Sequence, residues 1–368
     1  MNKNNSVAKK KPFLNRLVIF FVAIFAFIAM ISMLLCAVNP LVDPNFFVWT
    51  SFFGLAFWPI LFANILLFVI LVLLKARKSL YISLLAFIFA VPGFMRSYSV
   101  SKEGIDEGNL KIMSYNVCNF RDANNAKRNS NMVKNDIIQL INKEKPDIVC
   151  LQECGRWTKE SADDFGEKIG CKYHSKNTNN DRWNIIFSKF PLEDDSLTET
   201  FNNSGAAGFV KLVKAKSIGV FYLENNHLHS YNISRDEIEY VGDTKNYVEK
   251  SSKGKSIARK LKEGFELRTS NTKAIVENLP QNNTPIIICG DFNDTPLSYT
   301  YQRMKKAGLE DAFLEAGHGV GTTYCGRLPM LRIDYFWHSG EVNPLTFKVV
   351  KKQISDHYPI VMTCNISH

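Results

Sequence analysis

Charged side chains are missing from two long stretches near the N-terminus, residues 17–38 and 44–74. Each stretch is longer than the roughly 20 apolar residues that a helix needs to cross a bilayer. A third apolar run, between Lys78 and Arg96, is shorter and contains Pro92. None of the three runs carries an interior charge of the kind that marks ion or substrate pathways, which argues against a transporter or a sensor. We predict a transmembrane region over residues 1–96, with helices near 17–38, 48–74 and 79–95.

A cleavage site of small residues is also missing after the first run, so we interpret this run as a retained anchor and not as a signal peptide. Basic residues precede the first run and follow the second, whereas Asp43 is the only charge between them. Since basic flanks face the cytoplasm, three spans place everything after Arg96 outside, and two spans would leave it inside. We predict a multi-pass protein of the cytoplasmic (inner) membrane, with a linker at 97–108 and an extracytoplasmic domain at 109–368.

The part of the chain after the apolar runs lacks the excess of positive charge that favours nucleic-acid binding. The whole chain has a formal net charge of +10, from 45 Lys and Arg against 35 Asp and Glu. Ten of these basic residues and two of the acidic ones lie within residues 1–104, which leaves 35 basic and 33 acidic residues for the rest. The basicity of the chain is therefore mainly a signal for membrane orientation.

The spacing CxxC, typical of cysteine metal sites, does not occur among the eight cysteines. Cys36 lies in the first apolar run. Cys118, Cys150 and Cys289 lie in or beside strand-like runs, where a small buried thiol is the ordinary explanation. The other four cysteines could pair in an exported domain, but their connectivity cannot be derived from sequence, and we predict no disulfide.

From Leu110 onward, short apolar runs rich in β-branched residues alternate with amphipathic stretches, which is typical of an α/β fold. Helices are predicted at 131–143 and 256–279, where apolar residues recur on one face. Neither an internal repeat nor a low-complexity tract is present. The runs that we predict as strands are residues 110–116, 147–151, 184–188, 208–213, 219–223, 285–289, 333–337 and 359–363.

Polar side chains recur at or near the ends of these strands, where α/β proteins build their active sites. Taken singly, each has an ordinary structural explanation: residues 290–293 (GDFN) are more often a turn, and Asp334 beside Arg332 fits an ion pair. We favour a shared function because polar residues of the same few types recur near the end of one strand after another. In chain order they are Asn116, Glu153, His227, Asp291, Asn293, Asp334, Asp356 and His357.

These residue types are the ones needed to break a P–O bond. A hard cation such as Mg²⁺ takes oxygen ligands from one or two carboxylates, a role that suits Glu153 and Asp356, with Asn116 as a further ligand. Asp291 suits the orientation or deprotonation of water, and Asp334 can fix the tautomer of a neighbouring imidazole. The uncharged or cationic donors that can meet phosphoryl oxygens are Asn116, Asn293, His227 and His357.

The short segments that contain these residues, and the order in which they occur along the chain, resemble those of the endonuclease/exonuclease/phosphatase superfamily. Its members share the pancreatic deoxyribonuclease fold. The resemblance covers residue 110 to the C-terminus, and it implies a four-layer α/β sandwich of two packed β-sheets with helices outside. It also implies that Glu153 and Asp356 help to hold Mg²⁺, that Asp291 positions or activates water, and that Asp334 pairs with His357. The matching segments are Asn116 and residues 151–153 (LQE), 225–228 (NNHL), 290–293 (GDFN), 332–335 (RIDY) and 355–359 (SDHYP).

We therefore predict a membrane-anchored hydrolase of phosphodiester or phosphomonoester bonds that uses Mg²⁺, with Mn²⁺ as the alternative ion, for metal-assisted attack of water. Nucleic acid, phospholipid and small phosphodiesters all remain open as substrates. The bilayer is the expected partner of the N-terminal helices, and the sequence indicates no protein partner. The alternative is a catalytically inactive relative that binds a phosphorylated ligand or a partner at the membrane, although every expected polar residue is retained.

Overall fold

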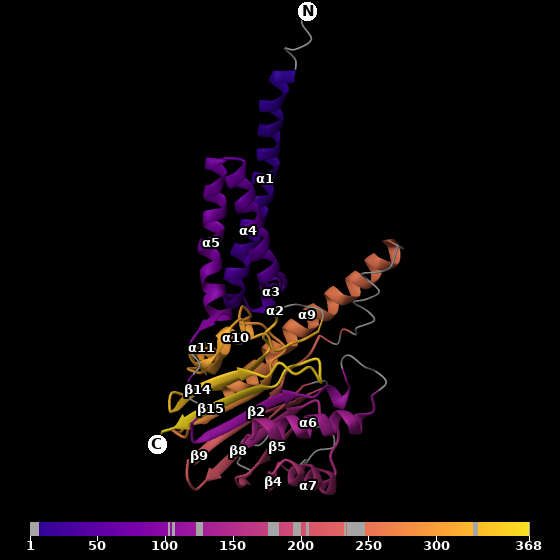
Figure 1. The fold of residues 1–368 in the computed structure, drawn as a ribbon, viewed down its shortest axis with the longest axis vertical. Helices are drawn as coiled ribbons and strands as arrows, with labels where there is room; N and C mark the ends of the chain where they lie inside the picture. Colours follow the sequence, from indigo (N-terminus) through magenta and orange to yellow (C-terminus); the bar gives the residue numbers. More distant parts are fainter. Residues whose placement is uncertain are drawn as a thin grey trace, which may run out of the picture. The chain divides into compact units, whose positions relative to one another are not determined.

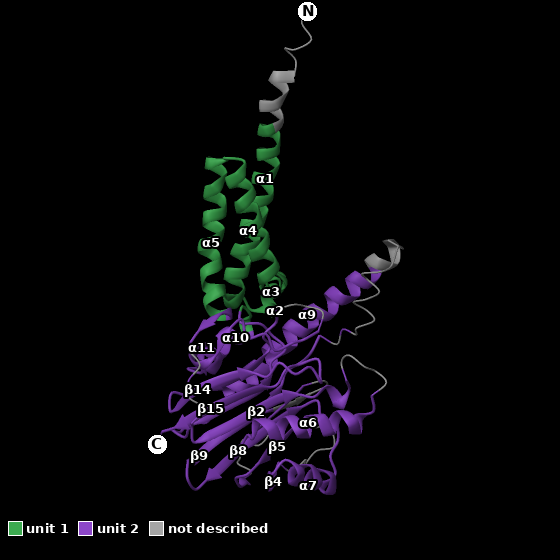
Figure 2. Ribbon diagram, viewed as in Figure 1, with its two compact units in different colours: residues 1–96, 297–299 green, residues 97–296, 300–368 purple. Residues whose placement is uncertain are grey.

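Two structural units make up the described part of the chain, which in the computed structural model comprises residues 7–101, 104, 107–122, 128–175, 184–193, 200–203, 206–231, 233, 247–326 and 330–367. The first unit consists of residues 1–96 with 297–299, and the second of residues 97–296 with 300–368 (Figure 2).

The first unit is built from helices that follow the uncharged stretches of the sequence (Figure 1). Two of them, α1 (Val7–Val38) and α5 (Arg77–Ser97), are long and apolar enough to cross a membrane. The others are η1 (Asn39–Leu41), α2 (Pro44–Phe47), α3 (Trp49–Leu55) and α4 (Phe57–Leu73). Taken as one span, α3 and α4 would give a third crossing, but a bend of 71° separates them.

The expectation of one continuous helix near 48–74 is corrected by this bend. Pro59 gives the physical reason, because its ring clashes with the carbonyl group four residues earlier and it has no N–H to donate. That carbonyl belongs to Leu55, the last residue of α3. Pro92 has no such effect, since α5 continues through it. The described residues thus contain two candidate spans, or three if the bent pair counts as one.

The second unit contains two β-sheets packed face to face (Figure 1). One sheet has the strand order β14 (Val342–Val349), β15 (Ile360–Ile366), β2 (Leu110–Asn116), β3 (Ile148–Gln152), β5 (Ile185–Ser188) and β4 (Tyr173–His174). The other has the order β11 (Glu310–Asp311), β13 (Asp334–His338), β10 (Ile286–Asp291), β9 (Gly219–His227), β8 (Ala206–Ala215) and β6 (Leu192–Glu193), with β7 (Phe201–Asn203) beside β8. A small separate sheet pairs β1 (Ser99–Val100) with β12 (His318–Gly319).

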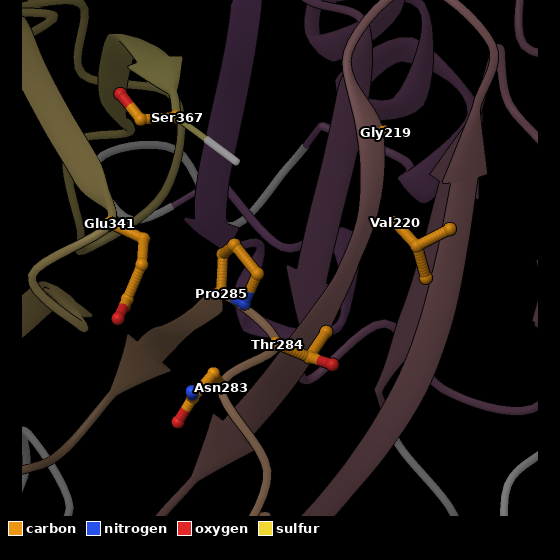
Figure 3. A pocket seen from close by; sticks show the side chains of 7 residues that line it. All are labelled: Gly219, Val220, Asn283, Thr284, Pro285, Glu341 and Ser367. Atoms are coloured by element: carbon orange, nitrogen blue, oxygen red, sulfur yellow. The ribbon is translucent and has the colours of Figure 1, made fainter.

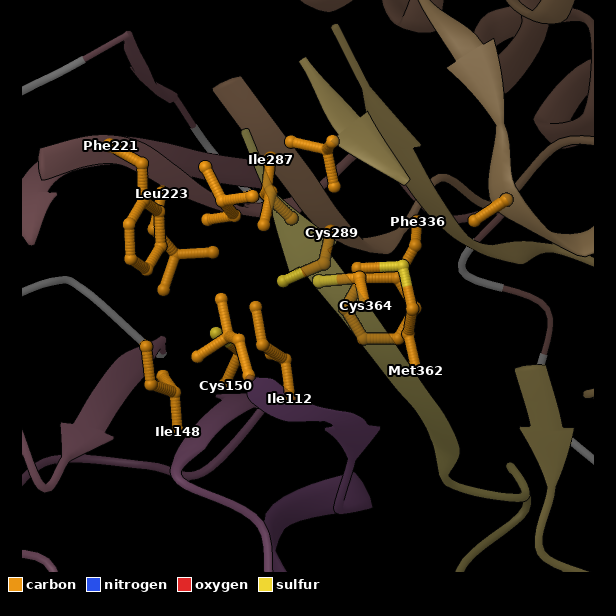
Figure 4. Close-up of a cluster of buried hydrophobic side chains, with 14 of the residues drawn as sticks. Ile112, Ile148, Cys150, Phe221, Leu223, Ile287, Cys289, Phe336, Met362 and Cys364 are labelled. Atoms are coloured by element: carbon orange, nitrogen blue, oxygen red, sulfur yellow. The ribbon is translucent and has the colours of Figure 1, made fainter. Parts of the chain in front are cut away.

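Apolar side chains fill the space between the two large sheets, with Ile112 and Ile148 on one side and Leu223 and Ile287 on the other (Figure 4). The outer face of the first sheet packs against α6 (Ser130–Glu144) and α7 (Lys159–Lys168). The outer face of the second packs against α9 (Tyr247–Glu277) and α10 (Tyr299–Lys306), while α11 (Ala312–Ala316) adds to the inner core. The predicted four-layer α/β sandwich is confirmed.

Glu224 is a buried acidic residue on β9, on the same strand face as Tyr222, which packs toward the helices. Its side chain is 3% exposed, and its Oε1 accepts a hydrogen bond from Thr200 Oγ1 at 2.8 Å. Burial raises the pKa of Glu224 to about 7, although hydrogen bonds from Thr200 and Asn226 oppose the rise.

Replacing Glu224 with glutamine should stabilise the protein at alkaline pH and leave it nearly unchanged in acid. Unfolded Glu224 ionises near pH 4.5 while the folded residue keeps its proton to about pH 7, so the folded state loses relative stability across this window. Above about pH 7 the free energy of unfolding stays lower by a constant amount of about 3 kcal/mol. The Glu224→Gln variant does not have this loss. Thermal melts of the full-length protein in detergent, across the window, measure the difference. The exposed Glu193, replaced in the same way, is the control, and a Glu224→Gln effect that does not change with pH would contradict this account.

Candidate active site

Strand pairing brings the predicted polar residues to one level at one edge of the sandwich. β9 and β10 run parallel and pair His227 with Asp291, and the antiparallel β13 pairs Asp334 with Asp291. In the other sheet, β2 and β3 run parallel and pair Asn116 with Gln152, the residue before Glu153. Side chains far apart in sequence therefore converge because of strand register.

Asn116 joins the two sheets at this edge. Its Nδ2 donates a hydrogen bond to Glu153 Oε1 at 3.0 Å and another to Asp291 Oδ2 at 2.9 Å. Its Oδ1 accepts the backbone N–H of Cys118 at 3.0 Å. One buried amide thus holds a carboxylate from each sheet, and its own orientation is fixed from the opposite side.

His357 lies between two carboxylates of the second sheet. Its Nδ1 is 2.9 Å from Asp334 Oδ2, and its Nε2 is 3.6 Å from Asp291 Oδ2. Burial alone would lower the pKa of His357, but the negative charges of Asp334 and Asp291 outweigh it and raise that pKa well above the ordinary value. The two carboxylates thus favour the protonated form of His357, with Asp334 fixing one ring nitrogen and the other nitrogen facing the site.

His227 and Glu153 form the opposite side of the cluster. His227 Nε2 is 3.2 Å from Glu153 Oε1 and 3.8 Å from Asp291 Oδ2. Burial would raise the pKa of Glu153, but His227 and the amide of Asn116 outweigh it and lower the pKa to about 2. The pKa of His227 is raised in turn, because the contact with Glu153 overcomes the opposing effect of burial. Glu153 is therefore ionised at neutral pH.

Asp291 is the carboxylate that all these contacts share. Burial raises its pKa to about 6, with a further rise from Asp334 and opposing effects of His357 and His227. The turn that follows holds it in place: the backbone N–H of Asn293 donates to Asp291 Oδ1 at 2.8 Å, and Asn293 Nδ2 lies 3.2 Å from Oδ2. A carboxylate with a pKa near neutrality, held in a fixed position, is suited to accept a proton.

Gly290 is required directly before this carboxylate. Its φ is +134°, and a Cβ placed there would lie 1.8 Å from the backbone oxygen of Asn226 on the neighbouring strand. No other residue fits such a close approach of two strands. The glycine of the GDFN segment therefore has a structural reason that is separate from the chemistry.

Among the residues that the structure describes, two groups of side chains could hold a metal ion, and within each group the ligand atoms lie within 4.8 Å of one another. The groups are Glu153, His227 and Asp291, and Asp291, Asp334 and His357. The first offers one carboxylate from each sheet, and the side chain of Glu153 is 27% exposed. Carboxylate oxygens are the ligands that Mg²⁺ prefers, so the residues fit a hard divalent cation.

Asp356, predicted as a metal ligand beside Glu153, lies in neither group. Ser355 Oγ is 3.2 Å from Asp356 Oδ1 and 2.9 Å from the backbone oxygen of Asn116, so Ser355 connects the two. The thiol of Cys118 also contacts Asp356, and burial together with this carboxylate raises the pKa of Cys118. The structure thus places Asp356 next to the cluster, on the side of Asn116.

Two residues of the matched segments link the sheets beneath the cluster. Gln152 Nε2 donates to Asn225 Oδ1 at 2.7 Å, and Asn225 Nδ2 lies 3.1 Å from the backbone oxygens of Leu151 and Ile185. Both side chains are fully buried. Their part in the LQE and NNHL segments is therefore to connect the two sheets.

Arg268 of α9 is completely buried beside the site, although it is not among the residues predicted from the sequence. Its Nε lies 3.2 Å from Asp294 Oδ2, its NH1 donates to the backbone oxygen of His229 at 3.0 Å, and its Cζ lies 4.2 Å from the centre of the Tyr231 ring. Asp294 follows Asn293 directly, and His229 comes two residues after His227. One guanidinium group thus ties together the two loops that follow the candidate residues of β9 and β10.

A signal for Arg268 was present in the sequence. The buried residues Phe265, Thr272 and Ile275 recur along α9 at helical spacing, and Arg268 falls on the same stripe. A charged residue at a core position of an amphipathic helix indicates a buried ion pair.

The pocket in Figure 3 lies away from this cluster, where β9 and β10 begin. Among the described residues that line it, Glu341 is the one acidic residue and none carries an imidazole. It therefore lacks the ligand set found at the other end of these strands. Its lining consists of Gly219, Val220, Asn283, Thr284, Pro285, Glu341 and Ser367.

Comparison with known families agrees with the fold. The model of the Endonuclease/Exonuclease/phosphatase family matches residues 113–357. The chain belongs to this family. A second family model, a domain of unknown function (DUF8431), matches residues 16–98, which contain the apolar helices.

Two solved structures illustrate how far the family fold extends. An endonuclease/exonuclease/phosphatase from Beutenbergia cavernae DSM 12333 has a TM-score of 0.51 and 14% identity, over 71% of this chain and 72% of that one. Its counterpart from Bacteroides vulgatus has a TM-score of 0.51 and 15% identity, over 70% of this chain and 99% of that one. At these identities the likeness concerns the fold alone. No curated protein matches the sequence at a significant level.

Proposed function

We propose that this member of the family is a metal-dependent phosphoesterase, anchored in a membrane by its N-terminal helices. It hydrolyses phosphodiester or phosphomonoester bonds. The observation that supports this most strongly is the convergence on Asp291 of Glu153, His227 and His357, which come from both sheets. Clustered carboxylates with cationic imidazoles supply metal ligands, a base and donors to phosphoryl oxygens in one place.

Glu153 and Asp356 are the ligands that we assign to the metal, with Asn116 beside them. The ion is Mg²⁺, with Mn²⁺ as the alternative. When bound, it polarises the phosphoryl group and lowers the pKa of water. The ionised state of Glu153 at neutral pH favours such binding, because a ligand that is already deprotonated releases no proton.

The remaining polar residues have separate tasks in this proposal. Asp291, held by the amides of Asn116 and Asn293, accepts the proton of the attacking water. His357 stays protonated through Asp334 and stabilises the negative charge that grows on the phosphoryl oxygens. His227 donates a hydrogen bond to the same group. Asn293, whose two Nδ2 hydrogens already bind Leu228 O and Asp291 Oδ2, positions Asp291 instead.

Three substrate classes suit this chemistry: nucleic acid, phospholipid and small phosphodiesters. The near-balance of 33 acidic and 35 basic residues outside 1–104 weighs against a long polyanion, whose binding depends on many cationic contacts. The proposed location is the cytoplasmic (inner) membrane. The domain at 109–368 follows a short linker at 97–108 and lies on the extracytoplasmic side.

The test is turnover by the full-length protein in detergent, on DNA, RNA, phospholipid and small phosphate esters, with Mg²⁺ or with a chelator. We expect hydrolysis of at least one substrate with Mg²⁺ and none with the chelator. Asp291→Ala and His357→Ala should each lower kcat by about 10²–10⁴-fold, the range typical of a lost acid or base. Asp163→Ala, which removes the exposed partner of His174, should leave kcat unchanged. Silence on every substrate would contradict an enzyme and favour an inactive, ligand-binding relative.

A further inference from the structure

Exposed apolar side chains gather on the short segment between α1 and α4. An aromatic ring that is 90% exposed, as in Phe46, is unfavourable in water and needs an apolar partner. The segment is too short for a membrane span, because α3 has only seven residues. The exposed residues are Leu41 at 64%, Phe46 at 90%, Phe47 at 47% and Trp49 at 61%.

A single carboxylate lies next to these rings. Asp43 is the only charged residue between Arg16 and Lys75, and it caps α2 by accepting the N–H of Asn45 at 2.8 Å. A charge is costly within the hydrocarbon core, so Asp43 must stay at the water boundary. Aromatic rings beside a solvated charge are typical of the membrane–water interface.

The angle between α3 and α4 agrees with an interfacial position. α4 has 17 residues and is about 26 Å long, which is at the lower limit for crossing the hydrocarbon core. The bend of 71° turns α3 away from that direction. A spanning helix is tilted by about 20° on average, so α3 then lies closer to the membrane plane than to its normal.

Contacts within the first unit show at which end this segment lies. Cys36 Sγ is 3.1 Å from the backbone oxygen of Phe53, and Asn64 Nδ2 donates to the backbone oxygen of Ala29 at 3.1 Å, so α1 and α4 run antiparallel. Ring contacts of Phe68 with Phe87 and of Trp58 with Phe94 show that α5 is antiparallel to α4. The segment is therefore at the end where α5 finishes and the chain continues toward the second unit.

We propose that residues 43–55 form an interfacial element, with α2 and α3 along the lipid headgroup region and the rings of Phe46, Phe47 and Trp49 in the upper part of the acyl chains. Only α1, α4 and α5 cross the bilayer. The element lies on the membrane face at which α5 ends. This inference rests on the membrane anchoring proposed above, and it does not depend on the catalytic proposal.

Depth-dependent fluorescence quenching tests this position in the full-length protein, reconstituted in phosphatidylcholine vesicles. An environment-sensitive fluorophore is attached at Phe46→Cys, in a chain that carries Cys118→Ser and Cys325→Ser, because the other six cysteines are buried. The control position is Leu66→Cys, in the middle of α4 and 61% exposed. Spin-labelled lipids carry the quencher either high on the acyl chain or near its end. A second label at Trp49→Cys covers the case in which Phe46→Cys does not fold.

The fluorophore at position 46 should be quenched at least about twofold more by the shallow spin label than by the deep one, and the control at position 66 should show the reverse. Stronger quenching of position 46 by the deep label would overturn the proposal in favour of a re-entrant loop. No quenching at position 46, with normal quenching at 66, would place the segment in water or under protein. No quenching at either position would refute the membrane anchoring itself.

Discussion

The Asp334→Asn variant should lose about 10²–10³-fold in kcat, because an amide in this place no longer stabilises a protonated imidazole. Asp334 Oδ2 lies 2.9 Å from His357 Nδ1, and its negative charge is among the causes that raise the pKa of His357. With asparagine this pKa falls. The pH above which activity declines should therefore move to lower values, as measured by a rate profile at saturating Mg²⁺.

A matched control for this change lies on the same strand. His338 of β13 is buried, and its Nε2 lies 3.2 Å from Glu315 Oε1, away from the cluster. The Glu315→Gln variant removes one carboxylate from one imidazole in the same manner, and it should leave both kcat and the pH profile unchanged. Equal losses in the two variants would show that Asp334 acts through stability and not through the protonation of His357.

The Arg268→Met variant should lower the free energy of unfolding by about 3–5 kcal/mol, because it leaves Asp294 as a buried charge without its cation. The exposed fractions of the two side chains are 0% and 7%, so water does not compensate for the loss. The two loops that Arg268 no longer holds carry His229 and Asp294 and follow directly after candidate site residues. We therefore expect kcat to fall as well. Denaturant unfolding of the full-length protein, followed alongside turnover, measures both effects.

Two further variants distinguish the cost of an unpaired buried charge from a non-specific loss of stability. The double variant Arg268→Met with Asp294→Asn should recover part of the stability, because the unpaired charge is gone. On the same helix, Arg259 pairs with Glu263 at 3.8 Å and is 72% exposed, so Arg259→Met should change stability little. A double variant as unstable as the sum of its single variants would exclude an important Arg268–Asp294 interaction.

Much of the sandwich could be predicted because its central strands are short apolar runs, buried on both faces. The first of them has the predicted bounds, Leu110–Asn116. β14 was missed, since its buried and exposed residues alternate irregularly, with Pro344 within it and a register shift before Thr346. The helix break before Pro59 was also missed, although Pro59 was visible, because hydrophobicity alone does not distinguish a straight span from a bent one.

The candidate site could be predicted as a set of residues and less well as an arrangement. The ends of the predicted strands indicate which polar side chains come together, because the apolar runs also determine the register of strand pairing. The distances across the sandwich depend on how the two sheets dock, and single-chain patterns do not encode this. The sequence therefore favours Glu153 and Asp356 as the metal pair, whereas the tight cluster centres on Asp291. Arg268 is a similar case, because its partner Asp294 comes from another segment.

The pairing of β2 with β15 has a consequence for synthesis of the protein. The first strand of its sheet finds this neighbour only in the last segment of the chain, Ile360–Ile366. On the ribosome, β2 must therefore keep an open edge until β15 has been synthesised, a state that invites aggregation. Removal of residues 360–366 would accordingly take away a strand from the interior of the sheet, next to the segment that carries His357.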